Sequence, residues 1–354
     1  MVEELTTPAE IAALADEWDM LAVSSGAPPF LRPGWITAWW EEFGTGRPVV
    51  VTLRRAGDLV AMVPLQRRAG SLESPTNWHT PAFGVLAVDA DARRELIGGL
   101  LDLPARRVDL EFLEETGPDA AAAAAGRRRL ERRVILREPF LRTDGEWDDY
   151  WRGISKNLRK TVNRCRNRLA DRGEVSFSVE DGGTGLDALL DAGLGLESSG
   201  WKGRQGTAMA SQPETVRFYR RIAGWAAEAG ILRLPFLRID GVPVAFQLSL
   251  EQHDREYLLK LGHDAALDRL GPGTVLTAEV LEDAFRRGLE SYEFCGADDD
   301  YKLRWTAEVR PMIRLQAFAP TAAGRTDRIV QVHGRGVARR ARAAAGSARE
   351  RLAR

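Results

Sequence analysis

Gly-Pro-Gly at residues 271 to 273 is a stretch whose residue types could bind a phosphate group. A β-rich run (255–262) and a polar connection (263–270) precede it, and an amphipathic run follows, which predicts a helix that begins at the glycines. Amides in the first helical turn lack intrahelical acceptors, and the helix macrodipole adds partial positive charge there. The candidate phosphate ligands are the backbone N–H groups of Gly271, Gly273, Thr274 and Val275.

The residues of this tripeptide suit that role individually. Glycine lets the backbone approach an anion closely, and Pro272 has a φ preset for the first helical turn and no N–H group to satisfy. A plain turn before a helix has the same composition, so the tripeptide alone leaves both interpretations open.

The length and composition are typical of a globular protein with two domains. The 354 residues exceed one ordinary core, so two domains of about 150 to 200 residues are expected. A net charge of −1 does not indicate nucleic acid as the main partner, although tRNA is not excluded. Cys165 and Cys295 lack neighbours at metal-ligand spacing, so we expect no metal and inert thiols. With no signal peptide or transmembrane run visible, we expect a cytoplasmic, soluble protein.

An internal repeat relates two parts of the chain. "VVVTLRRAGDLVAMVPL" (49–65) and "ILRLPFLRIDGVPVAFQLSL" (231–250) are both β-rich on either side of a glycine turn. Gly57 and Gly241 coincide when the two are superposed at an offset of 184 residues. Each segment is predicted to form an antiparallel hairpin.

The same offset relates the elements that follow. A helix and then an acidic, apolar strand are predicted at 91–115 and again at 272–298, with Asp109 on Glu293. We interpret this as two copies of one α/β unit, each a meander of antiparallel strands followed by a helix and a further strand. Chance overlap of two α/β segments is the alternative.

A basic helix is predicted between the copies, at 148–173. Its apolar residues recur at spacings of three and four, and Lys156, Arg159, Lys160 and Arg164 lie on the opposite face. Either this face is solvated, or it contacts an anionic substrate or a cofactor phosphate. The tail from residue 321, rich in Ala and Arg, is either a basic helix that touches an anionic surface or a solvated segment.

Seven segments of the second copy jointly carry a resemblance to a known family. They are "SKNLRKTVNRCRNRL" (155–169), "ESSGWKG" (197–203), "RFY" (217–219), "RIDGVPVAF" (238–246), "YLLKLGHD" (257–264), "GPGTVL" (271–276) and "CGADDDYKLRW" (295–305). Their layout resembles the GNAT acyltransferases, and within them the BioF2-like acetyltransferase domain, found in proteins associated with cellulose or exopolysaccharide biosynthesis. That branch is related in fold to the Fem-type peptidoglycan aminoacyltransferases, whose two GNAT-like halves match the repeat.

The resemblance implies a donor site in the second copy. In GNAT enzymes the glycine turn holds the pyrophosphate of acetyl-CoA or another acyl-CoA, and the thioester lies where two central strands splay apart. The family pattern begins with Gln or Arg, but Asp268 stands at that position here and Arg269, a candidate phosphate ligand, is displaced by one. The first copy has "VDADARRE" in place of Gly-Pro-Gly, so only the second is expected to bind CoA.

Acyl transfer to an amine needs a neutral amine, a polarised thioester carbonyl and a proton for the leaving thiolate. Tyr301 is the predicted general acid, because the resemblance places a phenol at this position after the strand. Asp264 or His263 is the candidate base, directly or through water, and Lys302 is a candidate to stabilise developing negative charge. The alternatives are a Tyr packed by its ring, an Asp that caps a helix, and a Lys paired with one of residues 298 to 300.

Four residues are candidates for binding the acceptor. Trp201 and Lys202 belong to the expected acceptor-side helix or loop. Asn77 and His79 lie in a turn-rich segment that the resemblance places at the interdomain cleft, and His79 coincides with His263 at the repeat offset. Core packing of Trp201 and local loop structuring by Asn77 and His79 are the alternatives.

The sequence therefore predicts an α/β protein of tandem GNAT-like domains, each a mixed, largely antiparallel sheet flanked by helices. The expected parts are a degenerate domain (1–145), a basic linker helix (146–173), an acyltransferase domain (174–320) and a basic tail (321–354). The predicted activity is that of an N-acyltransferase that moves an acetyl or other acyl group from CoA to an amine or hydroxyl. The acceptor would be a small-molecule or saccharide-linked group in the interdomain cleft. The alternatives are Fem-type transfer from aminoacyl-tRNA and a non-catalytic GNAT scaffold that binds a partner.

Overall fold

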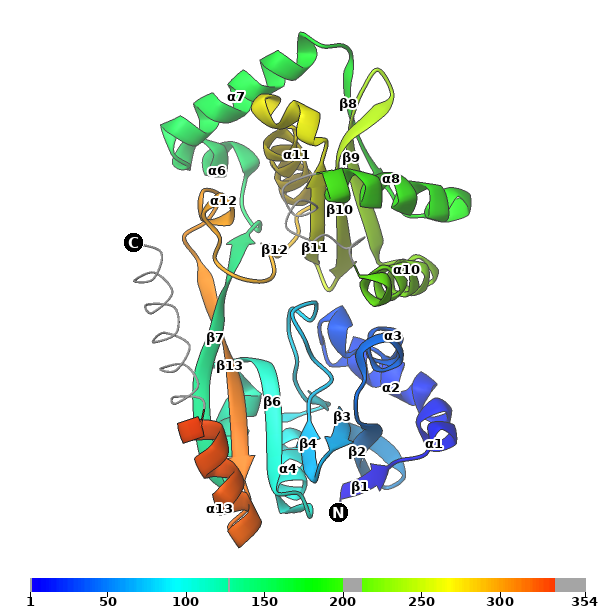
Figure 1. Ribbon diagram of the computed structural model, residues 1–354. Helices are drawn as coiled ribbons and strands as arrows, with labels where there is room; N and C mark the ends of the chain where they lie inside the picture. Colours follow the sequence, from blue (N-terminus) through cyan, green and yellow to red (C-terminus); the bar gives the residue numbers. More distant parts are fainter. Residues whose placement is uncertain (1, 127, 200–211, 335–354) are drawn as a thin grey trace, which may run out of the picture.

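The computed structural model describes residues 2–126, 128–199 and 212–334. Two lobes lie one above the other, and helices flank a sheet that continues from one lobe into the other (Figure 1). The strand order is β1-β2-β3-β4-β6-β13-β7-β12-β11-β10-β9-β8, with β5 paired to β3. Most neighbouring strands are antiparallel, which confirms the expected mixed, largely antiparallel α/β fold.

The lobes correspond to the two copies of the repeat. The first lobe consists of β1 (Val2–Leu5), α1 (Pro8–Ala13), α2 (Ala15–Ser24), η1 (Pro29–Leu31), α3 (Pro33–Phe43), β2 (Arg47–Arg55), β3 (Asp58–Arg68), β4 (Ser71–Glu73), β5 (Leu86–Ala87), α4 (Ala90–Asp102), β6 (Arg107–Glu114) and α5 (Pro118–Ala124). The second consists of α6 (Trp147–Gly153), α7 (Lys156–Ala170), β8 (Val175–Glu180), η2 (Gly183–Gly185), α8 (Leu186–Ser199), α10 (Pro213–Glu228), β9 (Leu232–Ile239), β10 (Val242–Gln252), β11 (Arg255–His263), η4 (Ala265–Leu270), α11 (Pro272–Arg286), β12 (Ser291–Glu293) and α12 (Asp300–Leu303).

The hairpins of the two copies have matching geometry. In β2/β3 the loop is Ala56-Gly57, with φ of 52° and 97°, and in β9/β10 it is Asp240-Gly241, with φ of 49° and 78°. Two-residue loops with positive φ at both positions are the hairpin turns that suit the twist of the flanking strands. Downstream, β4 pairs in parallel with β6, and β11 pairs in parallel with β12. The interpretation as two copies of one unit is confirmed.

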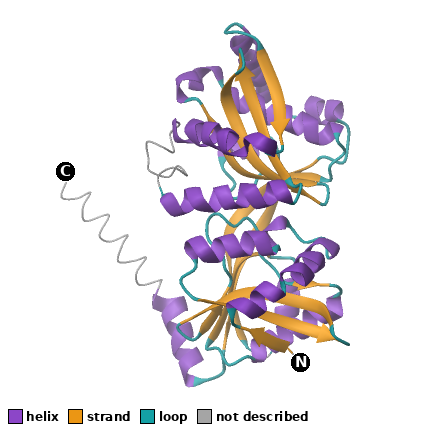
Figure 2. Ribbon diagram, turned by 90° about the vertical axis from the view of Figure 1, so that its right-hand side faces the viewer, coloured by secondary structure: helices purple, strands orange, loops and turns teal. Residues whose placement is uncertain are grey.

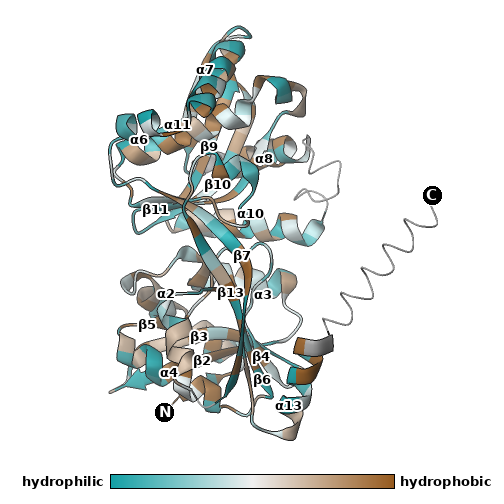
Figure 3. Cartoon of the chain, turned by 90° about the vertical axis from the view of Figure 1, so that its left-hand side faces the viewer, coloured by the Kyte–Doolittle hydropathy of each residue, from teal (hydrophilic) through white to brown (hydrophobic). Residues whose placement is uncertain are grey.

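Two long strands connect the lobes, β7 (Arg129–Arg142) and β13 (Val309–Phe318). β7 pairs with β13 over residues 129–139 and then with β12 over 140–142, so it begins in the sheet of the first lobe and ends in that of the second. β13, the last strand in the described part of the chain, lies between β6 and β7. Figure 3 shows both strands running between the lobes. Each lobe is thus completed by a strand from beyond its predicted boundary, and the boundaries at 145 and 320 stay a prediction.

The lobes also pack through helices α3 and α10, which lie side by side at their junction (Figure 2). A Cβ atom on Gly34 would lie 2.3 Å from the ring of Trp225, so the two helices approach each other too closely for a larger residue there. The ring of Trp35 packs edge-on against that of Phe218, with 5.2 Å between centroids. One buried apolar cluster includes residues of both lobes, which fixes their relative placement.

The region predicted as one basic helix forms two helices, which is a correction. α6 ends at Gly153, and α7 begins after Ser155, whose Oγ accepts a hydrogen bond from the amide of Leu158 at 3.2 Å. Serine at the N-cap position accepts a hydrogen bond from an amide of the first turn and so favours the start of a second helix. α7 buries the predicted apolar stripe and leaves Lys156, Lys160 and Arg164 exposed.

After β13 the described chain forms α13 (Ala322–Ile329) and a final turn (Val330–Gly334). The remainder of the predicted basic tail, 335–354, lies outside the described residues. No helix in the described part of the protein is long and apolar enough to cross a membrane.

Candidate active site

The central strands of the second lobe separate, as the resemblance implied. β11 pairs with β12 only from Arg255 to Tyr257, opposite Ser291 to Glu293. β12 ends there, whereas β11 continues to His263, where the only described strand that pairs with it is β10. The gap beyond Glu293 exposes the end of β11 to the start of α11 and to α12.

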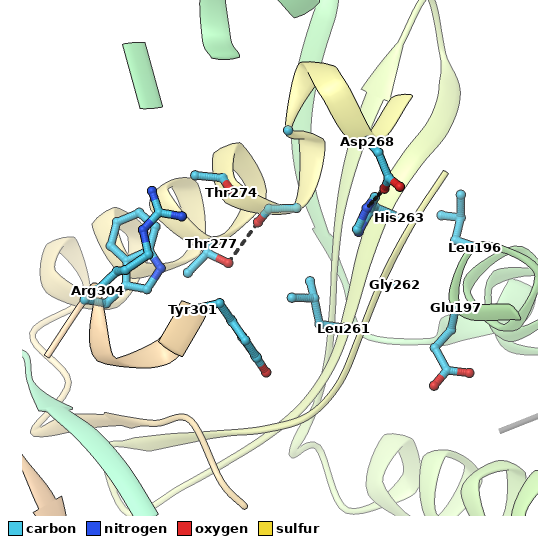
Figure 4. A pocket seen from close by; sticks show the side chains of 13 residues that line it. Leu196, Glu197, Leu261, Gly262, His263, Asp268, Thr274, Thr277, Tyr301 and Arg304 are labelled. Carbon is cyan, nitrogen blue, oxygen red and sulfur yellow. Dashed lines mark hydrogen bonds and ion pairs between the residues drawn. The ribbon is translucent and has the colours of Figure 1, made fainter. Parts of the chain in front are cut away.

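A cavity of about 300 Å³ lies at this point. It is lined by the end of β11, the turn before α11, the first helical turns of α11, the end of α8, and α12 with the two residues after it. Figure 4 shows His263 and Asp268 at the β11 end and Tyr301 and Arg304 at the α12 end. The elements that the sequence predicted around Gly-Pro-Gly therefore converge on one pocket.

The predicted helix start is confirmed, but the predicted set of amides is reduced. Gly271 is the N-cap of α11 in the left-handed conformation (φ 70°), and Pro272 is the first helical residue. The amide of Gly271 donates to Leu267 and Asp268, and the amides of Thr274 and Val275 donate to the carbonyl of Gly271. Those bonds close η4 and the first turn of α11. Within the described residues, only the Gly273 amide of the four has no backbone acceptor.

Asp268, the residue that departs from the family pattern, is the partner of His263. Its Oδ1 lies 2.6 Å from His263 Nε2, and both residues line the cavity. A carboxylate at Nε2 favours the tautomer with the proton on that nitrogen and makes Nδ1 the basic atom. A Cβ atom on Gly273 would lie 3.3 Å from Nδ1, so this nitrogen faces the start of α11. A His–Asp pair therefore stands beside the candidate anion site.

Tyr301 lines the cavity, with 43% of its surface exposed. Desolvation by its neighbours, and then the negative charge of Asp299, raise the pKa of its phenol above the ordinary value. The hydroxyl is therefore protonated at neutral pH and is able to donate a proton. Its role as general acid stays a prediction.

Asp264 and Lys302 do not line the cavity. Asp264 caps η4, and its Oδ1 accepts a hydrogen bond from the Ala266 amide at 2.9 Å. Lys302 is buried, and its Nζ donates to the carbonyls of Cys295 and Ala297 at 2.7 and 2.8 Å and pairs with Asp299 at 3.2 Å. Both side chains make the contacts of the alternative interpretations, a helix cap for Asp264 and pairing with one of residues 298 to 300 for Lys302.

The acceptor candidates of the first lobe lie apart from this cavity. The Oδ1 of Asn77 accepts from the amide of His79, which structures the loop locally. The His79 ring stacks on Phe43, and its Nδ1 lies 3.2 Å from the hydroxyl of Tyr219 on α10. Burial, together with the charge of Lys260, lowers the pKa of His79 to about 4, so the ring is neutral. His79 therefore belongs to the packing between the lobes.

Other predicted residues lie elsewhere. Trp201 and Lys202 fall outside the described residues. Arg269 does not line the cavity, and its carbonyl accepts from Arg168 of α7 at 3.3 Å. Neither Lys156, Arg159, Lys160 nor Arg164 of α7 lines it.

Several residues that line the cavity were not predicted as site residues, although most of them lie in the segments that carry the resemblance. They are Leu196, Glu197, Leu261, Gly262, Thr277, Arg304 and Trp305. Gly262 is required by packing, because a Cβ atom there would lie 2.6 Å from the backbone nitrogen of Glu197 in α8. Asp268 was visible only as a departure from a pattern.

Comparison with known proteins agrees with this geometry. Residues 156–303 match the family model described as an acetyltransferase (GNAT) domain. FemX has a similar structure, with a TM-score of 0.60 and 13% identity over 88% of this chain and 96% of its own. No curated protein matches the sequence.

Two further solved structures are similar. One is the C-terminal domain of a putative lysylphosphatidylglycerol synthetase from Agrobacterium fabrum, with a TM-score of 0.54 and 13% identity over 90% of this chain and 97% of its own. The other is L-PGS from Bacillus licheniformis, with a TM-score of 0.54 and 11% identity over 90% of this chain and 93% of its own. At these identities the likeness concerns the fold alone.

Proposed function

We propose that the second lobe transfers an acyl group, in the first instance acetyl, from acyl-CoA to an amine or hydroxyl of a small-molecule or saccharide-linked acceptor. The observation that carries the proposal is one cavity, at the splay of β11 and β12, that contains a His–Asp pair, a phenol and the start of α11. The match of residues 156–303 to an acetyltransferase domain supports it. The finer placement in the BioF2-like, cellulose-associated branch stays a prediction.

The start of α11 suits an anion, although it offers fewer available amides than the four that the sequence predicted. The Gly273 amide and the helix macrodipole favour negative charge, and Arg304 lines the same cavity. The negative charge of Asp268 opposes anion binding here, but its carboxylate pairs with His263. Acyl-CoA would supply an activated thioester carbonyl at the splay.

The chain's own residues would then move two protons. His263, oriented by Asp268, would accept the proton of the attacking amine or hydroxyl, directly or through water. Tyr301 would give its proton to the departing thiolate; its raised pKa keeps the phenol protonated before the reaction but also makes it a weaker acid. Exclusion of water by Leu196, Leu261 and Trp305 along the cavity wall would strengthen these interactions.

Calorimetric titration with acetyl-CoA and CoA tests the donor site. Gly273→Glu places a side chain and a like charge at the Gly273 amide, so we expect binding to fall at least a hundredfold. The matched control is Ala90→Glu, which adds the same carboxylate to the start of α4 in the first lobe and should leave CoA affinity unchanged. Equal affinity of Gly273→Glu and the parent would refute the phosphate site.

Release of free CoA thiol in the presence of a panel of amines and hydroxyl acceptors tests the chemistry. Tyr301→Phe should keep CoA affinity within a factor of about two and lower turnover at saturating acceptor about 10²-fold, the usual contribution of a general acid. Unchanged turnover would remove Tyr301 as the acid. If neither substitution affects the biological role, the non-catalytic scaffold is favoured.

Aminoacyl transfer from aminoacyl-tRNA is the second candidate, and the exposed basic face of α7 favours it. Lys156, Lys160 and Arg164 are exposed, and α7 packs beside η4 and α11. If this face holds a phosphate backbone, affinity for aminoacyl-tRNA should fall steeply with salt, and Lys160→Glu should reduce both the affinity and the salt slope. Lack of salt-sensitive binding would eliminate this candidate.

A further inference from the structure

A second cavity, also of about 300 Å³, lies between the lobes and shares no lining residue with the cavity at α11. Its walls come from loops 25–31 and 81–85 of the first lobe, from β11 and β12 of the second, and from the connecting strands β7 and β13. Apolar lining residues such as Phe30 and Phe83 stand beside a group of charged ones. Both lobes are needed to form it.

In that charged group one arginine faces three carboxylates. Arg310 lies 2.9 Å from Glu293, 3.7 Å from Glu114 and 3.8 Å from Glu138. Glu293 is satisfied at its other oxygen, which accepts a hydrogen bond from Ser291 at 2.7 Å. With Arg93, Arg255 and Asp119, which also line the cavity, the walls carry three arginines and four carboxylates, so they have an excess of negative charge or of bound protons.

Glu138 is the member of this cluster that the protein leaves incompletely satisfied. It is 3% exposed, and among the described residues its Oε1 has no hydrogen-bond partner. Its nearest cation, Arg310, is beyond hydrogen-bond distance and already binds Glu293. A buried carboxylate oxygen without a donor is costly, so its presence on a cavity wall indicates a ligand that donates to it.

The protonation of Glu138 agrees with this geometry. Burial, and then the negative charge of Glu293, raise the pKa of Glu138 to about 8, against the charge of Arg310, a hydrogen bond from the backbone of Gly296 and the charge of Lys302. A cation bound beside it would restore the ionised form. A proton donor that also carries positive charge satisfies both the oxygen and the charge.

The surroundings favour an organic ammonium over a metal ion. In the described ranges no group of three or more His, Cys, Asp or Glu is placed to hold a metal ion. An ammonium group has three N–H donors, and the apolar residues on the other walls suit the carbon skeleton that bears it. A volume of about 300 Å³ is at the lower end for small-molecule sites.

We propose that this interlobe cavity binds a small molecule through a primary ammonium group, with Glu138 as its counter-ion and hydrogen-bond acceptor. The bound amine stays protonated beside the carboxylate, whereas acyl transfer needs a neutral nucleophile. The site is therefore a recognition site, distinct from the point of chemistry at β11, and its occupation does not depend on the proposed acyl transfer.

Calorimetric titration of the full chain at pH 7, without CoA, tests the site with pairs of probes that differ in charge. The pairs are glucosamine with glucose and butylamine with butanol. The ammonium member of at least one pair should bind at least tenfold more tightly than its hydroxyl partner. Equal binding within both pairs, or no binding in either, overturns the proposal. Displacement of the amine by an equal concentration of KCl also overturns it, because the site would then be one for simple cations.

Variants assign the binding to Glu138. Glu138→Gln keeps the shape and removes the charge, so amine affinity should fall at least tenfold while the melting temperature stays at or above that of the parent. Glu131→Gln is the matched control on the same strand, where Glu131 pairs with Arg328, and should leave amine binding unchanged. Ala82→Leu narrows the cavity without touching Glu138 and should also weaken binding. Unchanged affinity in Glu138→Gln contradicts the assignment.

The Gly273→Glu variant separates this proposal from the proposed function. It should lose CoA binding and keep amine binding, because no residue lines both cavities. Loss of amine binding in that variant, with the fold intact, would contradict the independence of the two sites.

Discussion

The starts of α4 and α11 occupy equivalent places in the two lobes, but the two helices have different N-cap residues. α4 is capped by Asp89, whose Oδ1 accepts a hydrogen bond from the Ala92 amide at 2.6 Å. α11 is preceded by Gly271, which contributes no side chain and leaves the Gly273 amide facing a cavity. The first lobe thus supplies its own anion at this helix start, and we propose that the second accepts one from a ligand. On that proposal, a difference in one cap explains why only one of the two copies provides a donor site.

The repeat offset places Gly262 and Trp78 at equivalent positions. Substitution at these two positions should give the largest difference in the free energy of unfolding. Gly262→Ala forces a Cβ atom against the backbone of Glu197, so we expect the free energy of unfolding to fall by about 1–3 kcal/mol. Trp78 is 80% exposed, and Trp78→Ala should change it by less than about 0.5 kcal/mol. Denaturant unfolding of both variants measures the difference, and equal costs would contradict the packing of α8 on β11.

His79, the first-lobe equivalent of His263, should make the stability of the protein depend on pH. The pKa of His79 is lowered from 6.5 to about 4 by burial, so protonation favours the unfolded chain. Stability should therefore be full above pH 6.5 and fall progressively as the pH drops towards 4. The measurement is the difference in unfolding free energy between the parent and His79→Phe across this range. A difference that does not vary with pH would show that His79 is not held neutral.

Asp268 should have opposite effects on binding and turnover. Asp268→Asn removes a negative charge beside the proposed phosphate position, so CoA should bind a few-fold more tightly. The same change weakens the orientation of His263, and turnover should fall on the order of tenfold. Calorimetry and thiol release measure the two effects separately. If CoA affinity and turnover both fell, the role of Asp268 would be only to maintain the structure of the turn.

Asp89→Ala tests the first lobe directly and should have the smallest effect. Loss of this cap should lower the free energy of unfolding by about 1 kcal/mol, without any change in CoA affinity. Thermal unfolding and calorimetry provide the two readouts. Altered CoA affinity would mean that the first lobe also takes part in donor binding.

The sequence predicted an element correctly where residues within or beside that element determine its conformation. The turns at Gly57 and Gly241 follow from the need for positive φ in a two-residue loop, and α11 begins where Pro272 allows it. The apolar stripe of α7 follows from helical periodicity, although the cap at Ser155 was missed. The repeat was detectable because both copies preserve these local requirements.

Contacts between distant residues decided the rest. β13, the last strand that the structure describes, lies between β6 and β7, and no local periodicity in the sequence determines these hydrogen-bonding partners. The pairing of His263 with Asp268 depends on the conformation of η4 after β11. The hydrogen bond from Lys302 to the carbonyl of Cys295 depends on the conformation of the loop after β12. Glu138 and Glu293 share Arg310 only because β7, β12 and β13 are neighbours.

The sequence by itself therefore determined two α/β copies and which of them could present a helix start to a phosphate, because φ preferences and helix capping act within a few residues. The tertiary structure decided which side chains meet in the cavity at β11 and which carboxylate remains unsatisfied between the lobes. Both depend on strand order and burial, and these are set by contacts between residues far apart in the chain.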